Sequence, residues 1–396
     1  MRGAIGRCAL LAFATTMALP LPAAAQDDSK PCAARFPCLE VEYGSWLRYD
    51  DIHSKGQGTH TRRVYPDKGE LNFNLTWNDW LTTHAELKSE PARTPRAGST
   101  TILFGHALFL EQAFVAVDTG PFEVFAGKIN PSFGFAYEPR IAPGIFAKDF
   151  AEDYEITEML GFGMVWKTDL RQWNLGSHLL RGQAFFQDNT VLHTSALTRP
   201  RFGQSTADRI SDTTRGQGGP ANTGRPNNFS AMLQGGDFAA LPGLRYQASW
   251  AWLHHGDDGG RNLHAAGLGF AYETVLGKVG EADLRLTPIT ELVRIANPSG
   301  ERGRGWWWTV GTRIEIEPWY ISPAAGLRRL TDRADTPSGT DRFLTLTLEY
   351  HVIDKVTVGV GYKWERSPNG DGPCIGTCHV FGVRVTILAE KAWSLR

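Results

Sequence analysis

The sequence predicts an all-β protein, a transmembrane antiparallel up-and-down β-barrel of about 16 strands. Three observations support this: apolar and polar residues alternate in many segments, short and long connections alternate between them, and aromatic residues gather near segment ends. A hydrophobic fraction of 42% and an aromatic fraction of 11% exclude a disordered chain. The formal net charge of −1 argues against a nucleic-acid-binding protein, so no nucleic acid is expected as a partner.

The N-terminus carries the features of a secretory signal peptide. Two basic residues, Arg2 and Arg7, precede an apolar stretch at 8–21, which is too short to span a bilayer. Three alanines at 23–25 then precede a cleavage site at Gln26. The predicted division of the chain is a signal peptide at 1–25, a periplasmic N-terminal leader at 26–38, the barrel at 39–388 and a C-terminal tail at 389–396.

The alternation of apolar and polar residues is clearest near the C-terminus. In segment 341–352, Leu344, Leu346 and Leu348 fall on one face, and threonines and Glu349 fall on the other. Successive side chains of a strand point to opposite faces, so a period of two predicts strands. The predicted strands are 39–52, 70–77, 80–89, 106–118, 122–129, 156–167, 173–187, 228–237, 244–255, 262–274, 281–296, 303–316, 319–331, 341–352, 355–366 and 378–388.

The connections between these strands alternate in length. Tight turns on one rim and long loops on the other are typical of outer-membrane barrels, and an even strand count places both chain ends on the short-turn, periplasmic rim. The short connections are 78–79, 119–121, 168–172, 238–243, 276–280, 317–318 and 353–354. The longer ones are 53–69, 90–105, 130–155, 188–227, 256–261, 297–302, 332–340 and 367–377.

The polar face of the strands carries full charges in mid-strand. Sixteen strands enclose a lumen too wide for side chains to fill, so charges on an inward face can stay hydrated. Aromatic residues near the strand ends match the girdles at membrane interfaces, so the apolar face is expected to meet lipid. A large periplasmic β-sandwich or propeller is the alternative, but it leaves the alternating loop lengths unexplained. The predicted pore wall comprises Arg48, Arg245, Arg285, Arg313, Lys363 and Arg384.

Four cysteines follow the signal peptide, and an even number in an exported chain indicates disulfide bonds. Local pairing is the simplest of the three connectivities. A metal site would need more ligands than these spacings supply, so no metal is expected. The predicted pairs are Cys32 with Cys38 and Cys374 with Cys378.

Two stretches resemble Gram-negative outer-membrane porins. Residues 109–134, FLEQAFVAVDTGPFEVFAGKINPSFG, are similar to the hairpin that precedes the third extracellular loop in porins related to the phosphate-selective porins. Residues 144–166, GIFAKDFAEDYEITEMLGFGMVW, resemble outer-membrane proteins that include siderophore porins. The resemblance implies a sixteen-stranded channel, monomeric or homotrimeric, with loop three folded into the lumen. The chain departs from the family pattern where 389–396 follow the last strand in place of a terminal Phe.

The third long loop, 130–155, is the predicted pore constriction. Its carboxylates would face the basic wall, and opposed charges across a narrow passage favour polar solutes over apolar ones. A merely solvated acidic loop is the alternative. Glutamates on the inward face argue against strong anion selectivity: Glu291, Glu315, Glu349 and Glu365. The predicted constriction residues are Lys148, Asp149, Glu152, Asp153 and Glu155.

The sequence holds no nucleophile elbow, zinc-protease motif or P-loop, so neither an enzyme nor a cofactor is expected. We predict a Gram-negative outer-membrane porin that lets small hydrophilic solutes or ions diffuse passively. Its other partners would be the lipid bilayer and lipopolysaccharide. One alternative is a substrate-specific uptake channel for a siderophore, sugar or oxyanion, with a site formed by loop three and by loop four at 188–227. A barrel enzyme of the outer membrane is the other.

Overall fold

The structure, a computed structural model, describes residues 36–91, 95–138, 141–193, 218–256, 259–331, 338–368 and 374–394. The predicted signal peptide and most of the predicted leader lie outside these residues. The strands are β1 (Cys38–Ser54), β2 (Thr59–Asn78), β3 (Leu81–Pro91), β4 (Thr100–Ile102), β5 (His106–Asp118), β6 (Phe122–Ile129), β7 (Met159–Asp169), β8 (Ser177–Gln187), β9 (Asn228–Gly236), β10 (Leu244–Leu253), β11 (Leu263–Tyr272), β12 (Thr274–Val279), β13 (Ala282–Ala296), β14 (Arg304–Ile316), β15 (Trp319–Thr331), β16 (Gly339–Ile353), β17 (Val356–Ser367) and β18 (Gly376–Ser394).

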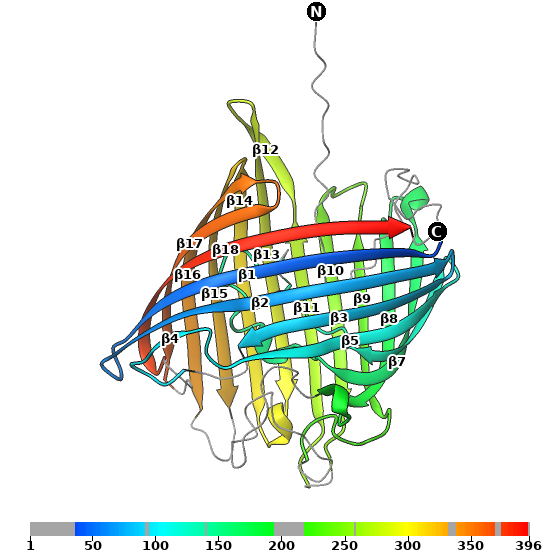
Figure 1. Cartoon of the computed structure of the whole chain (residues 1–396), viewed down its shortest axis with the longest axis horizontal. Coiled ribbons are helices and arrows are strands. Elements are labelled where there is room, and N and C mark those ends of the chain that lie inside the picture. The colour runs from blue at the N-terminus through cyan, green and yellow to red at the C-terminus, as the bar shows by residue number, and fades with distance from the viewer. Residues whose placement is uncertain are drawn as a thin grey trace, which may run out of the picture.

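These strands form one closed antiparallel barrel (Figure 1). Each strand pairs with its neighbours along the chain, and β1 pairs with β18 to close the ring. β4 is not a member of the ring, because it only adds a short parallel pairing to β2. β11 and β12 both pair with β13, so together they count as one strand of the ring. The ring therefore has 16 strands, as the sequence predicts. Among the described residues, no helix is long and apolar enough to cross a bilayer.

The largest differences from the predicted elements concern the first and last strands. The predicted loop 53–69 is wrong over most of its length, because β2 already begins at Thr59 and forms a long ribbon with β1 (Figure 1). The predicted tail 389–396 is also corrected: residues 389–394 continue β18 and pair with 38–43 of β1. Two strands that close a barrel have to match in length, because an unpaired edge would leave backbone groups without hydrogen bonds.

A smaller correction concerns the predicted strand 262–274. It is divided at Glu273 into β11 and β12, and β12 extends to Val279 as part of a hairpin beyond the barrel rim (Figure 1). The pairing of β11 with β10 ends at Tyr272, and the backbone N–H of Glu273 donates to the carbonyl oxygen of Gly243, just before β10. The long connections lie on the opposite rim, which by the rule for outer-membrane barrels is the extracellular one.

The side-chain exposure gives the barrel its polarity. On β16, Leu344 is 58% exposed and Leu346 is 54% exposed, whereas Thr345 is 6% exposed and Thr347 is fully buried at 0%. Apolar side chains that alternate with polar ones thus cover the outside of the barrel, and polar ones line its inside. This is the reverse of a water-soluble barrel and the arrangement expected in lipid.

Of the predicted disulfides, the Cys374–Cys378 bond is confirmed. It joins Cys374, at the end of the last long connection, to Cys378, near the start of β18. Cys38, the first residue of β1, is also disulfide-bonded. Its predicted partner, Cys32, lies outside the described residues.

A charge placed on the outer face should destabilise the barrel far more than the same charge placed on the inner face. Val360 lies midway along β17 and is 40% exposed on the outer face, and Thr357 lies on the inner face of the same strand. We expect Val360→Arg to lower the free energy of unfolding by about 2–4 kcal/mol, and Thr357→Arg to lower it by less than about 1 kcal/mol. Urea titrations in lipid vesicles measure both values, and equal losses would contradict the assigned faces.

Candidate functional site

The segment that connects β6 to β7, residues 130–158, is anchored by hydrogen bonds to side chains on the inner faces of distant strands. The main anchor is Glu291 of β13, which is 1% exposed. Its carboxylate accepts hydrogen bonds from the backbone N–H groups of Phe135 at 2.9 Å and Ala136 at 2.8 Å, and from the hydroxyl of Tyr154 at 2.5 Å. On β10, the side chain of Gln247 donates to the carbonyl oxygen of Gly134 at 2.6 Å.

The same segment is also held from other parts of the ring. The indole of Trp307 on β14 and the guanidinium of Arg328 on β15 both donate to Asp153, at 2.9 and 2.8 Å. On β17, the ammonium of Lys363 donates to Asp149 at 2.6 Å. Lys148 forms an ion pair with Asp67 of β2 at 3.2 Å. Strands far apart in the ring therefore hold one segment.

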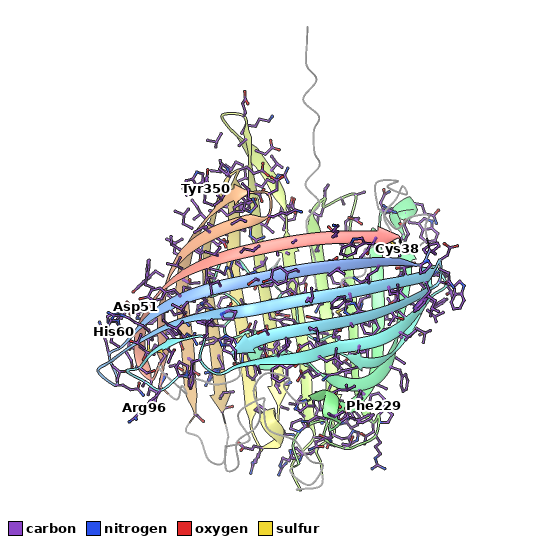
Figure 2. The ribbon with its side chains drawn as sticks, viewed as in Figure 1. Cys38, Asp51, His60, Arg96, Phe229 and Tyr350 are labelled. Carbon is purple, nitrogen blue, oxygen red and sulfur yellow. A yellow bond between two sulfur atoms is a disulfide. The ribbon has the colours of Figure 1, made fainter. Side chains whose placement is uncertain are left out.

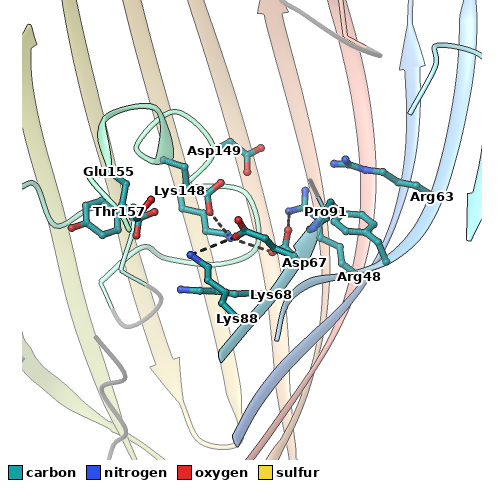
Figure 3. Close-up of a pocket in the computed structure, with 14 residues that line it drawn as sticks. Arg48, Arg63, Asp67, Lys68, Lys88, Pro91, Lys148, Asp149, Glu155 and Thr157 are labelled. Carbon is teal, nitrogen blue, oxygen red and sulfur yellow. Dashed lines mark hydrogen bonds and ion pairs between the residues drawn. The ribbon is translucent and has the colours of Figure 1, made fainter. Parts of the chain in front are cut away.

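A cavity of about 520 Å³ lies between this segment and strands β1, β2 and β3 (Figure 3). The strand side is rich in cations and the segment side is rich in carboxylates. The strands contribute Arg48, Arg63, Tyr65, Asp67, Lys68, Lys88, Glu90 and Pro91. The segment contributes Tyr137, Lys148, Asp149, Glu152, Glu155 and Thr157.

A β-bulge directs the charges of β2 into this cavity. The pairing of β1 with β2 shifts register after Trp46, which pairs with Lys68, whereas the next residue pairs with Pro66. Asp67 is thus the extra residue, and both Asp67 and Lys68 line the cavity although they are adjacent in sequence. Bulges re-aim side chains in this way, and they accommodate the missing N–H of a strand proline.

The strand side of the cavity is built around a buried carboxylate on β1. Asp50 is fully buried and accepts from Arg48 at 2.7 Å, from Arg63 at 2.8 Å and from the hydroxyl of Tyr65 at 2.7 Å. Arg48 also donates to Asp67 at 3.2 Å. This network fixes two guanidinium groups against the wall, because each buried charge has a partner of opposite sign.

Lys148 joins the two sides of the cavity. Its ammonium lies 3.2 Å from Asp67 on the strand side and 2.7 Å from Glu152 within the segment. Burial by itself would lower the pKa of Lys148, but Asp67 and Glu152 outweigh that effect and raise it above the ordinary value of a lysine. Lys148 therefore stays charged and bonded across the full physiological pH range.

Burial by itself lowers the pKa of a lysine but raises the pKa of a carboxyl group, and this raises the pKa of two carboxyl groups in the segment. It raises the pKa of Glu155, against the lowering effect of Lys88 and Lys68. It raises the pKa of Glu138 to about 7, and the nearby carboxylate of Glu291 adds to this shift. Glu138 lines a smaller pocket next to the large cavity, together with Arg181 and Glu155. The segment thus carries a carboxyl group that titrates near neutral pH.

Four of the five predicted constriction residues line the cavity: Lys148, Asp149, Glu152 and Glu155. Asp153 does not, since it is bonded to Trp307 and Arg328. The predicted wall is more dispersed. Arg48 lines the cavity, Lys363 bonds Asp149, and Arg384 forms an ion pair with Glu349 at 2.7 Å. The structure places Arg245, Arg285 and Arg313 on other parts of the wall, on β10, β13 and β14.

Sequence reasoning missed most of the strand side of the cavity. Arg63, Asp67 and Lys68 fall in the predicted loop 53–69. This stretch shows no alternation of apolar and polar residues strong enough to predict a strand. Lys88 lies near the end of the predicted strand 80–89, and Glu90 begins the predicted loop 90–105; neither is among the predicted site residues. Most of the other predicted site loop, 188–227, lies outside the described residues, because 194–217 are among those not described.

Comparison with solved structures supports the assignment of the fold. The chain is similar to the outer membrane channel DcaP of Acinetobacter baumannii, with 12% identity, a TM-score of 0.54 and coverage of 89% of this chain and 97% of that one. It is also similar to an anion-selective porin from Comamonas acidovorans, with 10% identity, a TM-score of 0.55 and coverage of 90% and 99%. It is similar as well to OprB of Pseudomonas putida, with 12% identity, a TM-score of 0.55 and coverage of 89% of this chain and 94% of that one. The chain has the barrel fold of Gram-negative outer-membrane porins.

Sequence comparisons add no relative. No family model matches the chain. No curated protein matches it in sequence. The likeness therefore concerns the backbone fold, and the chemistry of the site has to be argued from the residues of this chain.

Removal of the Glu291 carboxylate should release the segment. We expect Glu291→Ala to lower the free energy of unfolding by about 3 kcal/mol, since each buried donor left without an acceptor costs roughly 1–3 kcal/mol. The segment should also become sensitive to limited proteolysis. Glu315→Ala is the matched control, because Glu315 also faces inward and the described part of the chain shows no hydrogen bond from it to this segment. Equal losses in both variants would show that Glu291 is not the anchor.

The raised pKa of Glu138 predicts a pH-dependent ion preference. As pH rises from 6 to 8, Glu138 loses its proton and adds one negative charge beside the cavity, so the cation-to-anion permeability ratio should rise. The change should be roughly twofold, because a unit charge about 8 Å away in water alters an ion's energy by about 0.5 kcal/mol. Reversal potentials in a salt gradient measure it, and the change should be smaller in Glu138→Gln than in the native protein. The charged groups around Glu138 are Glu291, Arg181, Glu155 and Arg245.

Proposed function

We propose that the protein is an outer-membrane porin, and that small hydrophilic solutes and ions diffuse passively through its lumen. The observation that carries the proposal is the charged cavity between the segment 130–158 and strands β1, β2 and β3. The segment would fold into the lumen as loop three and narrow it there. Its bonds to β2, β10, β13 and β17 support this, because a chain held by inner faces on different sides of a ring has to cross the interior.

The arrangement of charge indicates what would pass. Five basic and five acidic residues line the cavity, and the cations come mainly from the strands while the carboxylates come mainly from the segment. Separated charges of opposite sign produce a transverse field that favours polar solutes, and their balance predicts weak selectivity between anions and cations. This balance does not favour a phosphate channel, which would need an excess of Arg and Lys.

Three further proposals concern the partners of the protein, its assembly and its activity. Lipid and lipopolysaccharide as partners, a homotrimeric assembly and the absence of enzymatic activity all rest on the sequence and on the porin resemblance. A channel specific for a siderophore, sugar or oxyanion would differ from the proposed porin in showing saturable block of its conductance by that solute.

Neutralising the acidic side of the cavity should turn the channel toward anions. We expect the triple variant Asp149→Asn, Glu152→Gln and Glu155→Gln to lower the cation-to-anion permeability ratio about three- to tenfold, as three unit charges several ångströms from the ion path would predict. Single-channel recordings in planar bilayers, with reversal potentials in a salt gradient, measure the ratio.

A matched variant separates this effect from a general disturbance of the pore. Neutralising the basic side with Arg63→Gln and Lys88→Gln should raise the same ratio while the conductance is retained. An unchanged ratio in both variants would place the cavity outside the ion path. Absence of any conductance from the folded native protein would contradict the porin function itself.

A further inference from the structure

Two histidines and an aspartate gather on the outer surface of the barrel, at the extracellular end of the β1–β2 ribbon (Figure 2). Asp51 and His53 are two residues apart on β1 and therefore point to the same face. His60 of β2 lies directly opposite His53 in the strand register. The side chain of His379 on β18 lies opposite His53 on the other side. Three imidazoles thus stand in one row across β2, β1 and β18.

The ligand atoms of this cluster converge. One atom each from Asp51, His53 and His60 lies within 4.8 Å of the others. Nε2 of His53 is 3.5 Å from Oδ1 of Asp51, and Nε2 of His60 is in direct contact with the same oxygen. The two imidazole rings are stacked with centroids 3.8 Å apart, so both rings present the same edge to the carboxylate.

The second carboxylate oxygen of Asp51 is held by other groups. The hydroxyl of Tyr49 donates to Oδ2 at 3.4 Å, and the guanidinium of Arg62 lies 3.6 Å from it. Oδ1 is thereby left to face the two imidazoles. Such outer partners orient the carboxylates of metal sites. Arg62 also approaches Nδ1 of His60 at 3.5 Å, but its side chain is 50% exposed and can turn into solvent when an ion binds.

We propose that Asp51, His53 and His60 form a surface binding site for a first-row transition-metal ion such as Zn²⁺. Two imidazole nitrogens and one carboxylate oxygen suit Zn²⁺, Ni²⁺ or Cu²⁺, whereas Ca²⁺ and Mg²⁺ require sets of oxygen ligands. Small side-chain rotations would bring the three atoms to the usual 2.0–2.2 Å of zinc ligands, and water would complete the coordination.

The place of the site in the barrel makes it separate from the pore. Tyr49 precedes Asp51 on the outer face of β1, and Phe381 of β18 lies opposite Asp51. Aromatic residues of this kind are typical of a membrane interface, and His53 lies further toward the hairpin than Tyr49 on the same face of β1. The neighbouring inward residue, Asp50, belongs to the cavity network and points the other way. An ion bound outside would therefore bridge β1 and β2 at the barrel seam without entering the lumen.

Isothermal titration of Zn²⁺ into the full chain tests the site, using tag-free protein that has been refolded in detergent and treated with a chelator. We expect one ion per chain to bind at micromolar concentration. His53→Ala, His60→Ala and Asp51→Asn should each weaken binding at least tenfold, since loss of a ligand should cost no less than loss of an outer partner. His264→Ala is the matched control, because His264 is an exposed histidine near the same rim on β11, and this variant should bind as the native protein does.

Two results of the Zn²⁺ titration would overturn the proposal. It is overturned if the native chain binds no Zn²⁺ below about 1 mM, or if His60→Ala and Asp51→Asn keep native affinity. The slower migration of heated samples in electrophoresis confirms that each variant is folded before titration. Because the ligands lie outside the lumen, conductance should be unchanged in these variants, so the site and the porin function can fail independently.

Discussion

The rest of the structure depends on the requirement that every backbone N–H and C=O group in lipid finds a partner within the protein. A sheet satisfies this only when its first and last strands pair, as β1 and β18 do over the full length of β1. Closure over 16 strands leaves an interior that wall side chains cannot fill. Charged groups can therefore line that interior, and the properties of the site follow from the closure of the ring.

Within this frame, the charges are stabilised mainly by one another. Asp50 is bonded to Arg48 and Arg63, and Asp67 to Arg48 and Lys148, so few charges of the cavity network are buried alone. The segment is held in the same manner by Glu291 and by bonds to Asp149 and Asp153. Pairing of opposite charges explains how the cavity can be lined by many charged side chains and still have a net charge near zero.

Most strands were predictable because they carry a period-two pattern of their own, which needs no knowledge of distant residues. The individual contacts that anchor the segment 130–158 were not predictable, because the partners are far apart in sequence: Lys363 meets Asp149 across 214 positions and Glu291 meets Phe135 across 156. The bulge that turns both Asp67 and Lys68 inward breaks the alternation on which the strand prediction relies. The histidine row at the seam likewise exists only after β2, β1 and β18 are brought side by side.

Chemical labelling of single cysteines in vesicles is the most direct test of the central claim, that the barrel is apolar outside and wet inside. Cysteines at the inward positions Thr287 and Arg313 should react with a charged, water-soluble thiol reagent. Cysteines at the outward positions Leu344, Leu346 and Leu348 should resist it and react with a lipid-soluble one. The reverse pattern, or equal reaction of both sets with the charged reagent, would contradict a membrane-spanning barrel with an aqueous lumen.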